Sequence, residues 1–168
     1  CSDEWCLEVI TTPGHLCDHI CLALKGSKVI FSGDHVMGWS STVIVPPMGN
    51  MADYISSLKK LLKRKEDIYL PGHGPLLFNA KNFVKSQLTH REDRKNQILA
   101  LLKSETLSAK ELADRLYPTI KPGLKLAAQH NIYAHLIDLT NNKYVVHTGE
   151  LSIESRFSIE SRFSKKLY

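Results

Sequence analysis

The chain has 168 residues, of which 43% are hydrophobic and 23% are charged, the balance of a folded globular protein rather than of a disordered one. No apolar run approaches the roughly 18 residues that a membrane span needs, so a membrane protein is not expected. The net charge of +5 is compatible with an anionic partner, although a modest excess of lysine is more often only a solvated surface.

All four cysteines lie near the start of the chain. Disulfide frameworks of small secreted proteins spread their cysteines along the sequence. The step from Cys17 to Cys21 is also wider than the usual spacing of structural zinc pairs. No secretory leader opens the sequence, so we expect structural or incidental thiols and a cytoplasmic protein. Because the first residue is Cys1 rather than methionine, we also expect that the sequence is not an intact translation product.

The first 78 residues predict a layer of strands with a helix packed on it. From Glu8 to Pro47, short β-branched runs alternate with Gly, Pro and Asp, which predicts strands at EVITTPG, ICLALKG, KVIFSGD and STVIVPP. From Met51 to Arg64, apolar residues recur at three- and four-residue steps, which predicts an amphipathic helix. DIYL predicts another strand, ended by PGHGP. Residues 1–78 are therefore expected to form one α/β domain.

The strand signals vanish after this point. Residues 79–148 predict one or two helices through a charged middle, then a helix starting at Ser108, where Glu111 completes a capping box. A third helix is predicted from Leu124 to Leu139, followed by the short strand KYVVH. Three helices and then a β-element are the order of a winged-helix-like module. The tail, residues 149–168, contains SIESRF twice and is predicted to be disordered or helical, with no function assigned.

Three motifs place a metal-ligating side chain directly after a strand and beside glycine. TTPGH ends in His15, FSGDH contains Asp34, and LPGHGP contains His73. Glycine lets the backbone turn sharply there. Histidine nitrogens and an aspartate oxygen are ligands that zinc and similar ions accept in hydrolases, and an aspartate can bridge two ions. A lone histidine after such a turn is usually only a loop residue, but the three motifs in this order predict a metal site.

This order of motifs resembles the metallo-β-lactamase-fold hydrolases. The stretch SGDHVMGWSSTVIVPPMGNMADYISSLKKLL, with LPGHGP and the segment around THRED, is similar to a subgroup called β-lactamase-like protein 2, in which a small winged-helix-like domain follows the catalytic fold. The resemblance covers about Val9 to Val146. It implies a two-zinc site with three catalytic ligands and three substrate-binding residues. The implied ligands are His15, Asp34 (bridging) and His73, and the implied substrate-binding residues are His35, His90 and Arg91.

The resemblance also implies a fold class and an incomplete site. The family fold is an αββα sandwich of two similar halves, and this chain is expected to hold only the C-terminal half. The signature HxHxDH, which supplies the other ligands, is absent from the sequence, and Leu16 follows TPGH where the family commonly has Thr or Ser. We therefore expect weak zinc binding and no activity from the chain alone. We also expect a complementary N-terminal half, or self-association, to cover the apolar sheet face that remains.

The implied parent activity is hydrolysis by a metal-bound hydroxide, and RNA is the favoured substrate within the subgroup. A basic helical segment is compatible with a phosphate backbone, although such segments are usually only solvated. The alternative is a non-catalytic winged-helix module that binds nucleic acid or protein. The residues of the basic segment are Lys81, Lys85, His90, Arg91, Arg94 and Lys95. In the alternative, the polar side chains of the third helix that could contact nucleic acid are Lys125, Gln129 and Asn131.

Overall fold

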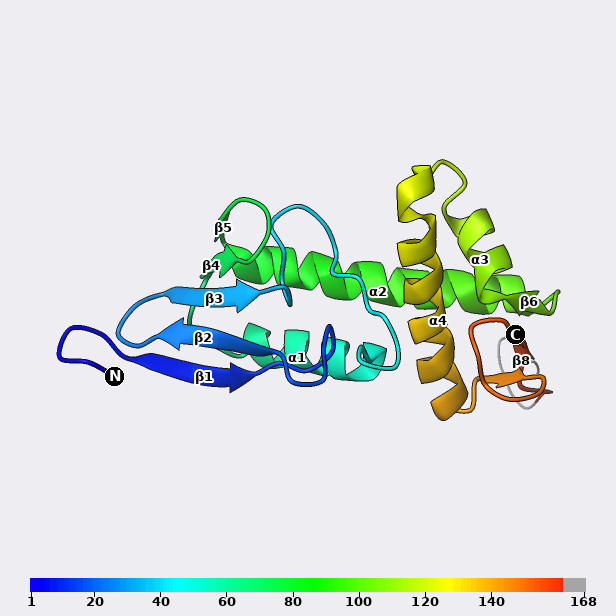
Figure 1. Ribbon diagram of the computed structural model, residues 1–168, viewed down its shortest axis with the longest axis horizontal. Coiled ribbons are helices and arrows are strands. Elements are labelled where there is room, and N and C mark those ends of the chain that lie inside the picture. The colour runs from blue at the N-terminus through cyan, green and yellow to red at the C-terminus, as the bar shows by residue number, and fades with distance from the viewer. Residues whose placement is uncertain (162–168) are drawn as a thin grey trace. The chain divides into compact units, whose positions relative to one another are not determined.

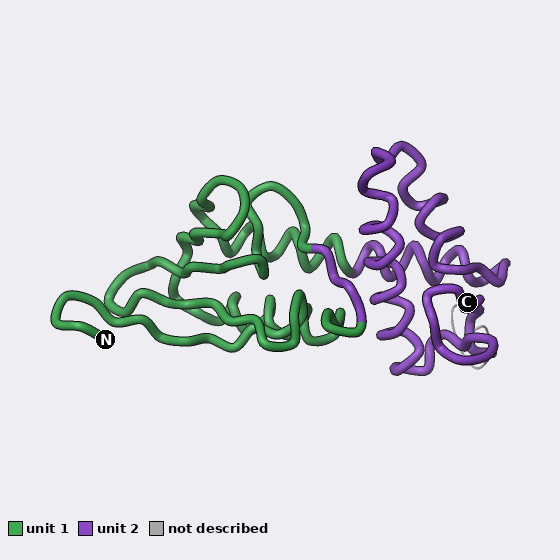
Figure 2. The backbone as a smooth tube through the Cα atoms, in the orientation of Figure 1, with its two compact units in different colours: residues 1–42, 47–91 green, residues 43–46, 92–168 purple. Residues whose placement is uncertain are grey.

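The computed structural model describes residues 1–161, which divide into two compact units (Figure 2). Unit 1 consists of residues 1–42 and 47–91, and unit 2 consists of residues 43–46 and the chain from residue 92 onward. The boundary between the units falls inside one long helix. Within the described part of the chain, no helix has both the length and the apolar character to cross a membrane.

Unit 1 is a five-stranded sheet with helices on one face. The strand order is β1-β2-β3-β4-β5, and every neighbouring pair is antiparallel except β3 and β4, which are parallel. In Figure 1, β1 and β2 pass in front of α1. The elements are β1 (Leu7–Thr11), β2 (Ile20–Leu24), β3 (Val29–Gly33), α1 (Met51–Leu62), β4 (Ile68–Pro71), β5 (Leu77–Phe78) and α2 (Ala80–Leu102), whose first half belongs to this unit.

The helices of unit 1 form where the periodicity predicts them. Asn50 caps α1, because its side-chain oxygen accepts a hydrogen bond from the backbone N–H of Asp53. The buried side chains of α1 recur at helical spacing, and the buried side chains of α2 in this unit form a similar stripe. They are Met51, Tyr54, Leu58 and Leu61 in α1, and Ala80, Val84, Gln87 and Arg91 in α2.

The prediction of a strand at STVIVPP is wrong. The residues between β3 and α1 contain no strand. The backbone N–H of Ile44 donates instead to the side-chain oxygen of Asn131, 2.9 Å away, within unit 2. Pro46 and Pro47 have no N–H to offer a sheet. Ile44 is fully buried, although the segment that contains it has no regular secondary structure.

Unit 2 has a closed core built from three helices and a small antiparallel sheet, of order β6-β8-β7. The predicted capping box is confirmed: Ser108 and Glu111 exchange side-chain-to-backbone hydrogen bonds of 2.7 and 3.2 Å. Leu112, Ile132 and Phe157 are fully buried in this core. The elements are the second half of α2, β6 (Leu107–Ser108), α3 (Ala109–Leu116), η1 (Pro122–Leu124), α4 (Lys125–Asn141), β7 (Val145–His147) and β8 (Arg156–Ile159).

The tail prediction is wrong for the residues of β8. This strand spans the junction of the two SIESRF copies and pairs with both β6 and β7. Phe157, at the end of the first copy, is fully buried between its neighbours. A disordered or helical tail cannot place an aromatic ring in the core in this way. The end of the second copy, residues 162–163, lies outside the described residues.

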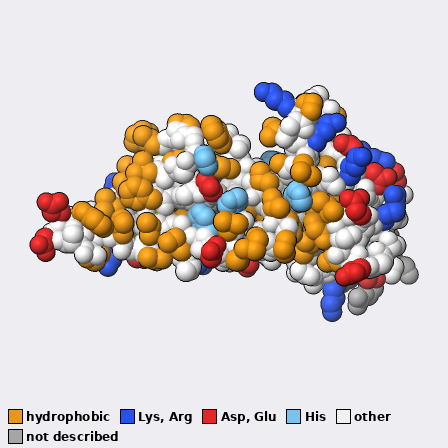
Figure 3. Space-filling view, viewed as in Figure 1, with side chains coloured by type: hydrophobic (Ala, Val, Ile, Leu, Met, Phe, Trp, Pro, Cys, Tyr) orange, Lys and Arg blue, Asp and Glu red, His pale blue; other side chains and the backbone are white. Residues whose placement is uncertain are grey.

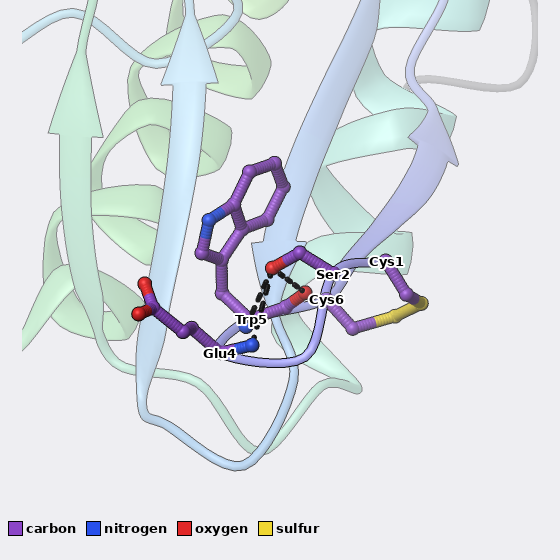
Figure 4. The surroundings of a disulfide bond; sticks show 5 residues. All are labelled: Cys1, Ser2, Glu4, Trp5 and Cys6. Atoms are coloured by element: carbon purple, nitrogen blue, oxygen red, sulfur yellow. Dashed lines mark hydrogen bonds between the residues drawn. A yellow bond between two sulfur atoms is a disulfide. The ribbon is translucent and has the colours of Figure 1, made fainter.

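The cysteines also differ from expectation at one pair. Cys1 and Cys6 form a disulfide across a turn in which Ser2 and Trp5 are hydrogen-bonded, as Figure 4 shows. The turn brings two cysteines five residues apart into contact, which the spacing alone did not indicate. The thiols of Cys17 and Cys21 are free, the first exposed and the second buried.

Candidate metal centre

The three predicted ligands follow three strands whose C-terminal ends lie at one edge of the sheet. β1 and β3 are each antiparallel to β2, and β3 is parallel to β4, so β1, β3 and β4 run in the same direction. His15 comes four residues after β1, Asp34 directly after β3, and His73 two residues after β4. Sequence order and strand pairing thus bring the three motifs to the same edge.

Asp34 and His73 are close neighbours. Nε2 of His73 lies 3.6 Å from Oδ1 of Asp34, and both side chains are accessible to solvent, 59% and 37% exposed respectively. Yet Oδ1 itself is buried and accepts no hydrogen bond from the described residues. A Cβ at Gly72 would lie 2.8 Å from the same oxygen, so glycine is what keeps the space beside it open. A carboxylate oxygen without a donor, facing an imidazole nitrogen, is suited to a cation.

His19 connects this pair to the loop of the first motif. The backbone N–H of Asp34 donates to Nε2 of His19 at 3.2 Å, so that nitrogen carries no proton. The proton is therefore on Nδ1, which donates to the hydroxyl of Thr12 at 2.9 Å. Burial lowers the pKa of His19, with the neighbouring His15 acting in the same direction, which favours this neutral form. At Gly33, φ is +53° and a Cβ would meet the His19 ring at 2.8 Å, so the GD motif requires glycine here.

His15 lies on the outer side of this arrangement. Its ring centroid is 6.4 Å from that of His19, in edge-to-face orientation. The loop that holds it is tied to the start of α1 by a hydrogen bond of 2.8 Å from Asn50 N–H to Gly14 O. Over residues 1–161, no three His, Cys, Asp or Glu side chains come together closely enough to hold an ion by themselves. The structure therefore brings Asp34 and His73 together. His15 lies beside His19, which in turn accepts the backbone N–H of Asp34.

Two of the predicted substrate-binding residues, His35 and Arg91, are buried in this structure, and their role stays a prediction. His35 is fully buried against the ring of Tyr54, with ring centroids 4.8 Å apart, and burial lowers its pKa to about 3. Arg91 is 2% exposed, donates to the backbone oxygen of Thr42, and lies over the Tyr54 ring at 5.1 Å. His90 is exposed on α2, and its role stays a prediction.

The basic segment of α2 is partly committed to internal contacts. The guanidinium of Arg94 lies 4.0 Å from the centroid of the Tyr117 ring, and Lys95 pairs with Glu92 at 3.2 Å. Arg91 is buried as well and donates to the backbone oxygen of Thr42. The segment therefore gives less support to a phosphate-binding surface than its sequence indicated.

Trp39 is the site residue that the sequence did not single out. Its indole is 68% exposed and nearly parallel to the imidazole of His73, with 6.2 Å between centroids and 8° between planes. A hydrogen bond of 2.9 Å from Gly38 N–H to His73 O fixes the two loops together. A tryptophan five residues after a candidate ligand, in a loop with no predicted strand or helix, was the available signal. Figure 3 shows histidine side chains gathered around an acidic one on this face, bordered by hydrophobic groups.

The donor set fits a cation only in part. Asp34 offers an oxygen without a hydrogen-bond donor, and His73 offers a nitrogen beside it. Zinc, as a borderline-soft ion, accepts both donor types. A catalytic zinc ordinarily takes three protein ligands, which this pair does not supply.

Comparison with known proteins matches both parts of the chain to families. Residues 3–73 match the Metallo-beta-lactamase superfamily, and residues 108–154 match the Beta-lactamase associated winged helix domain. Beta-lactamase-like protein 2 homologs from Caenorhabditis elegans and Drosophila melanogaster are 32% and 31% identical over 75% and 79% of this chain. These alignments cover 42% and 45% of the relatives, so the chain spans less than half of their length. An Atrochrysone carboxyl ACP thioesterase from Aspergillus fumigatus is 31% identical over 58% of this chain and 30% of its own length.

Solved structures show the same fold. A metallo-beta-lactamase family protein from Thermus thermophilus superposes with a TM-score of 0.79 and 24% identity, over 91% of this chain and 49% of its own. A beta-lactamase domain protein from Burkholderia ambifaria gives 0.81 and 22%, over 91% and 48%. The chain therefore belongs to the metallo-beta-lactamase superfamily and carries a beta-lactamase associated winged helix domain after its metallo-beta-lactamase segment.

Proposed function

We propose that this chain supplies part of the two-metal site of a metallo-β-lactamase-type hydrolase, with zinc as the ion. Asp34, His73 and His15 are the residues that would hold the ions, with Asp34 as the ligand that the two ions would share. The observation that carries the proposal is the buried Oδ1 of Asp34, which has no hydrogen-bond donor and lies 3.6 Å from Nε2 of His73.

The residues around this pair have positioning roles. Zinc bound here supplies an activated water for hydrolysis. The hydroxyl of Thr42 donates to the backbone oxygens of Asp34 and His35, and His19 accepts the N–H of Asp34, so the aspartate backbone is held on both sides. Outer contacts of this kind orient ligands and are as necessary as the ligands themselves.

We further propose that the chain alone is inactive as a hydrolase. His15 with Asp34, and Asp34 with His73, give two protein ligands to each ion, one of them shared. Catalytic zinc ordinarily takes three. The remaining ligands belong to an HxHxDH segment that does not occur in these 168 residues.

Zinc binding by the full chain tests the site. We expect weak binding in equilibrium dialysis, lost in Asp34→Asn and His73→Ala. Asp18→Asn, which removes an exposed carboxylate from the His15 loop, is the matched control, and His90→Ala controls for loss of an exposed imidazole. Both controls should bind zinc like the parent chain. Binding that survives Asp34→Asn and His73→Ala together places the ion elsewhere and contradicts the proposal.

Hydrolysis assays test the inactivity of the isolated chain. With zinc in excess, we expect no cleavage of a fluorogenic single-stranded RNA and none of a short acyl-coenzyme A thioester above that of Asp34→Asn. Turnover that Asp34→Asn abolishes would show that two ligands per ion suffice. The metal-site proposal would then stand while the inactivity would be refuted.

For the complete hydrolase we propose RNA as the substrate. The supporting observation is Trp39, whose exposed indole is parallel to the His73 imidazole, because bases of single-stranded RNA stack on aromatic side chains. The net charge of +5 acts in the same direction. The competing class is a thioester, which the names of two fungal relatives indicate for those proteins.

Tryptophan fluorescence distinguishes these substrate classes without catalysis. The chain has two tryptophans, so Trp5→Phe leaves Trp39 as the single reporter. We expect an RNA oligonucleotide to quench this signal and an acyl-coenzyme A to leave it unchanged. Trp39→Leu should weaken RNA binding measured by anisotropy of a labelled oligonucleotide. Quenching by the thioester alone would reverse the substrate assignment.

The alternative is a binding module without catalysis, formed by unit 2. Its favouring observation is the closed core of this unit, which depends on no metal. One of the three residues expected to contact nucleic acid is not exposed, however, because Asn131 is buried and accepts a hydrogen bond from the N–H of Ile44. A salt-dependent gel shift with duplex DNA, unaffected by Asp34→Asn and Trp39→Leu, would support this alternative over the hydrolase.

A cytoplasmic location is part of the proposal. Free thiols at Cys17 and Cys21 support it, and the Cys1–Cys6 disulfide is the observation against it. Thiol titration of the protein purified from its native source tests it. Two additional reactive thiols, from Cys1 and Cys6, are expected in a reducing compartment.

A further inference from the structure

A chain of hydrogen bonds connects the backbone of Asp34 to the interior of unit 1. It begins at the backbone N–H of Asp34, which donates to Nε2 of His19 at 3.2 Å. Nδ1 of His19 lies 2.9 Å from Oγ1 of Thr12, and this oxygen lies 3.3 Å from Sγ of Cys21. Sγ in turn lies 3.4 Å from the backbone oxygen of Ser32. The chain of contacts therefore starts just after β3 and returns to β3.

A single arrangement of protons satisfies all of these hydrogen bonds. A backbone N–H can only donate and a backbone oxygen can only accept, so both ends of the chain have a fixed direction. Nε2 of His19 must accept at one end, and the thiol of Cys21 must donate at the other. With one proton on each group, Nδ1 then donates to the hydroxyl of Thr12, and this hydroxyl donates to Sγ of Cys21. The arrangement places the proton of neutral His19 on Nδ1.

The inner groups of the chain are closed off from solvent. Thr12, Cys21 and Ser32 are all 0% exposed. Burial also raises the pKa of the Cys21 thiol to about 11, so the thiol keeps the proton that it donates. Solvent has no access by which to replace a lost hydroxyl or thiol at these positions. Removing one of them would therefore leave its neighbour in the chain without a partner.

Two observations distinguish this arrangement from small polar side chains that only fill the core. The contacts of Thr12 and Cys21 lead to the backbone of Asp34, whose side chain lies 3.6 Å from His73. In addition, φ of Gly33 is +53° and a Cβ there would lie 2.8 Å from Nε2 of His19. The backbone before Asp34 thus adopts a conformation suited to glycine at the point where the imidazole reaches it.

We propose that Thr12 and Cys21 are positioning residues for Asp34, because their hydroxyl and thiol hold His19 in the tautomer that accepts the Asp34 N–H. The opposite tautomer would point an Nε2 proton at that N–H, and the residues after β3 would lose this anchor. The consequence for zinc rests on the proposed function. The position of the proton on His19 does not, and it can be measured without metal.

Nuclear magnetic resonance of the metal-free chain tests the proton position. A long-range proton–nitrogen correlation spectrum distinguishes protonated from unprotonated imidazole nitrogens, and the His19 signals are assigned by their loss in His19→Gln. We expect the parent chain to carry the proton on Nδ1, and Thr12→Val and Cys21→Ala to show a mixture of tautomers. Thr12→Ser and Cys21→Ser keep a donor in place and should retain the parent pattern. The matched control is Ser57→Ala, which removes a buried hydroxyl that donates to Pro13 instead of contacting His19.

Amide exchange and zinc binding measure the effect on Asp34. Hydrogen exchange of the Asp34 amide should be faster in Thr12→Val than in the parent chain, and Thr12→Ser should stay close to the parent. In equilibrium dialysis, the zinc affinity of Thr12→Val should fall about 10- to 100-fold, the usual effect of losing a group that orients a ligand. Thr12→Ser should bind zinc like the parent chain.

The outcomes separate this inference from the metal site itself. A parent chain with the His19 proton on Nε2 overturns the proposal without any variant, so a misfolded Thr12→Val does not protect it. The same holds if Thr12→Val and Cys21→Ala both leave the tautomer unchanged. A changed tautomer with unchanged Asp34 exchange and zinc affinity refutes the positioning role. If the parent chain binds no zinc, the proposed function fails, whereas the tautomer and the Asp34 exchange still decide this inference.

Discussion

The two units differ in how completely they bury their apolar side chains. In unit 2, α2, α3 and α4 and the strands of a small sheet enclose one core, in which Leu112, Ile132 and Phe157 are fully buried. In unit 1, the sheet buries one face under helices and leaves the other apolar and exposed. Unit 2 therefore completes its own core, whereas the sheet of unit 1 leaves one apolar face uncovered by the described residues. The candidate metal site lies on the incomplete unit, and its ligand set is incomplete as well.

The largest expected difference between the units is in the response to losing a phenylalanine. Phe157→Ala empties a fully buried position in unit 2 and should cost about 3–5 kcal/mol. Phe31→Ala removes an outward ring of unit 1, 41% exposed, and should cost about 1 kcal/mol or less in the dissociated chain. Urea unfolding at low protein concentration measures both. Equal losses would mean that the outer face of the sheet is already covered.

A smaller difference is expected between the ion pairs of the two units. Arg64 donates to Glu8 at 2.8 and 3.0 Å and to the buried Glu66 at 3.0 and 3.1 Å. Arg64→Met leaves Glu66 buried without a partner and should cost about 2 kcal/mol, less than for a fully buried pair because Arg64 is partly exposed. Arg115→Met breaks the exposed pair with Glu105 in unit 2 and should hardly change stability. Chemical denaturation of both variants at pH 7 makes the comparison, and a larger loss for Arg115→Met would contradict it.

The smallest effect concerns pH. The hydrogen bond from Arg64 lowers the pKa of Glu8. Burial acts to raise the pKa of Glu66, but the hydrogen bond from Arg64, a backbone hydrogen bond and the charges of Arg64 and Lys65 together lower it. A carboxyl whose pKa is lowered by folding stabilises the protein above its ordinary value of 4.5, and this contribution disappears as the pH falls below that value. The urea midpoint should therefore drop between pH 5 and pH 3, and it should drop less in Arg64→Met. An unchanged pH dependence in the variant would assign the loss to other carboxyls.

The sequence predicted the position of the site better than its surroundings. TTPGH, FSGDH and LPGHGP each end a strand, and parallel strand directions then bring Asp34 and His73 together. The burial of Arg91 could be predicted only by knowing that Ala80, Val84 and Arg91 of α2 all face the core of unit 1. That orientation depends on tertiary packing, which motif spacing does not encode.

The errors in the fold have a similar origin. Ile44 reads as part of a strand by composition, but its N–H bonds to Asn131, 87 residues away in the sequence. The SIESRF tail is predicted to be disordered or helical, but the junction of its two copies forms β8, because Phe157 fills the core of unit 2. Both depend on partners distant in sequence, whereas local patterns such as the Ser108 capping box were predicted correctly.

Hydrogen exchange tests most directly the claim that unit 2 is complete and unit 1 is not. Amides of β2 and β3 should exchange faster than those of α4, because one face of their sheet is not packed against another layer. Amides of α3 and the buried part of α4 should exchange slowly. If β2 and β3 are as protected as α4, the sheet closes its own core and the account of an incomplete layer is wrong.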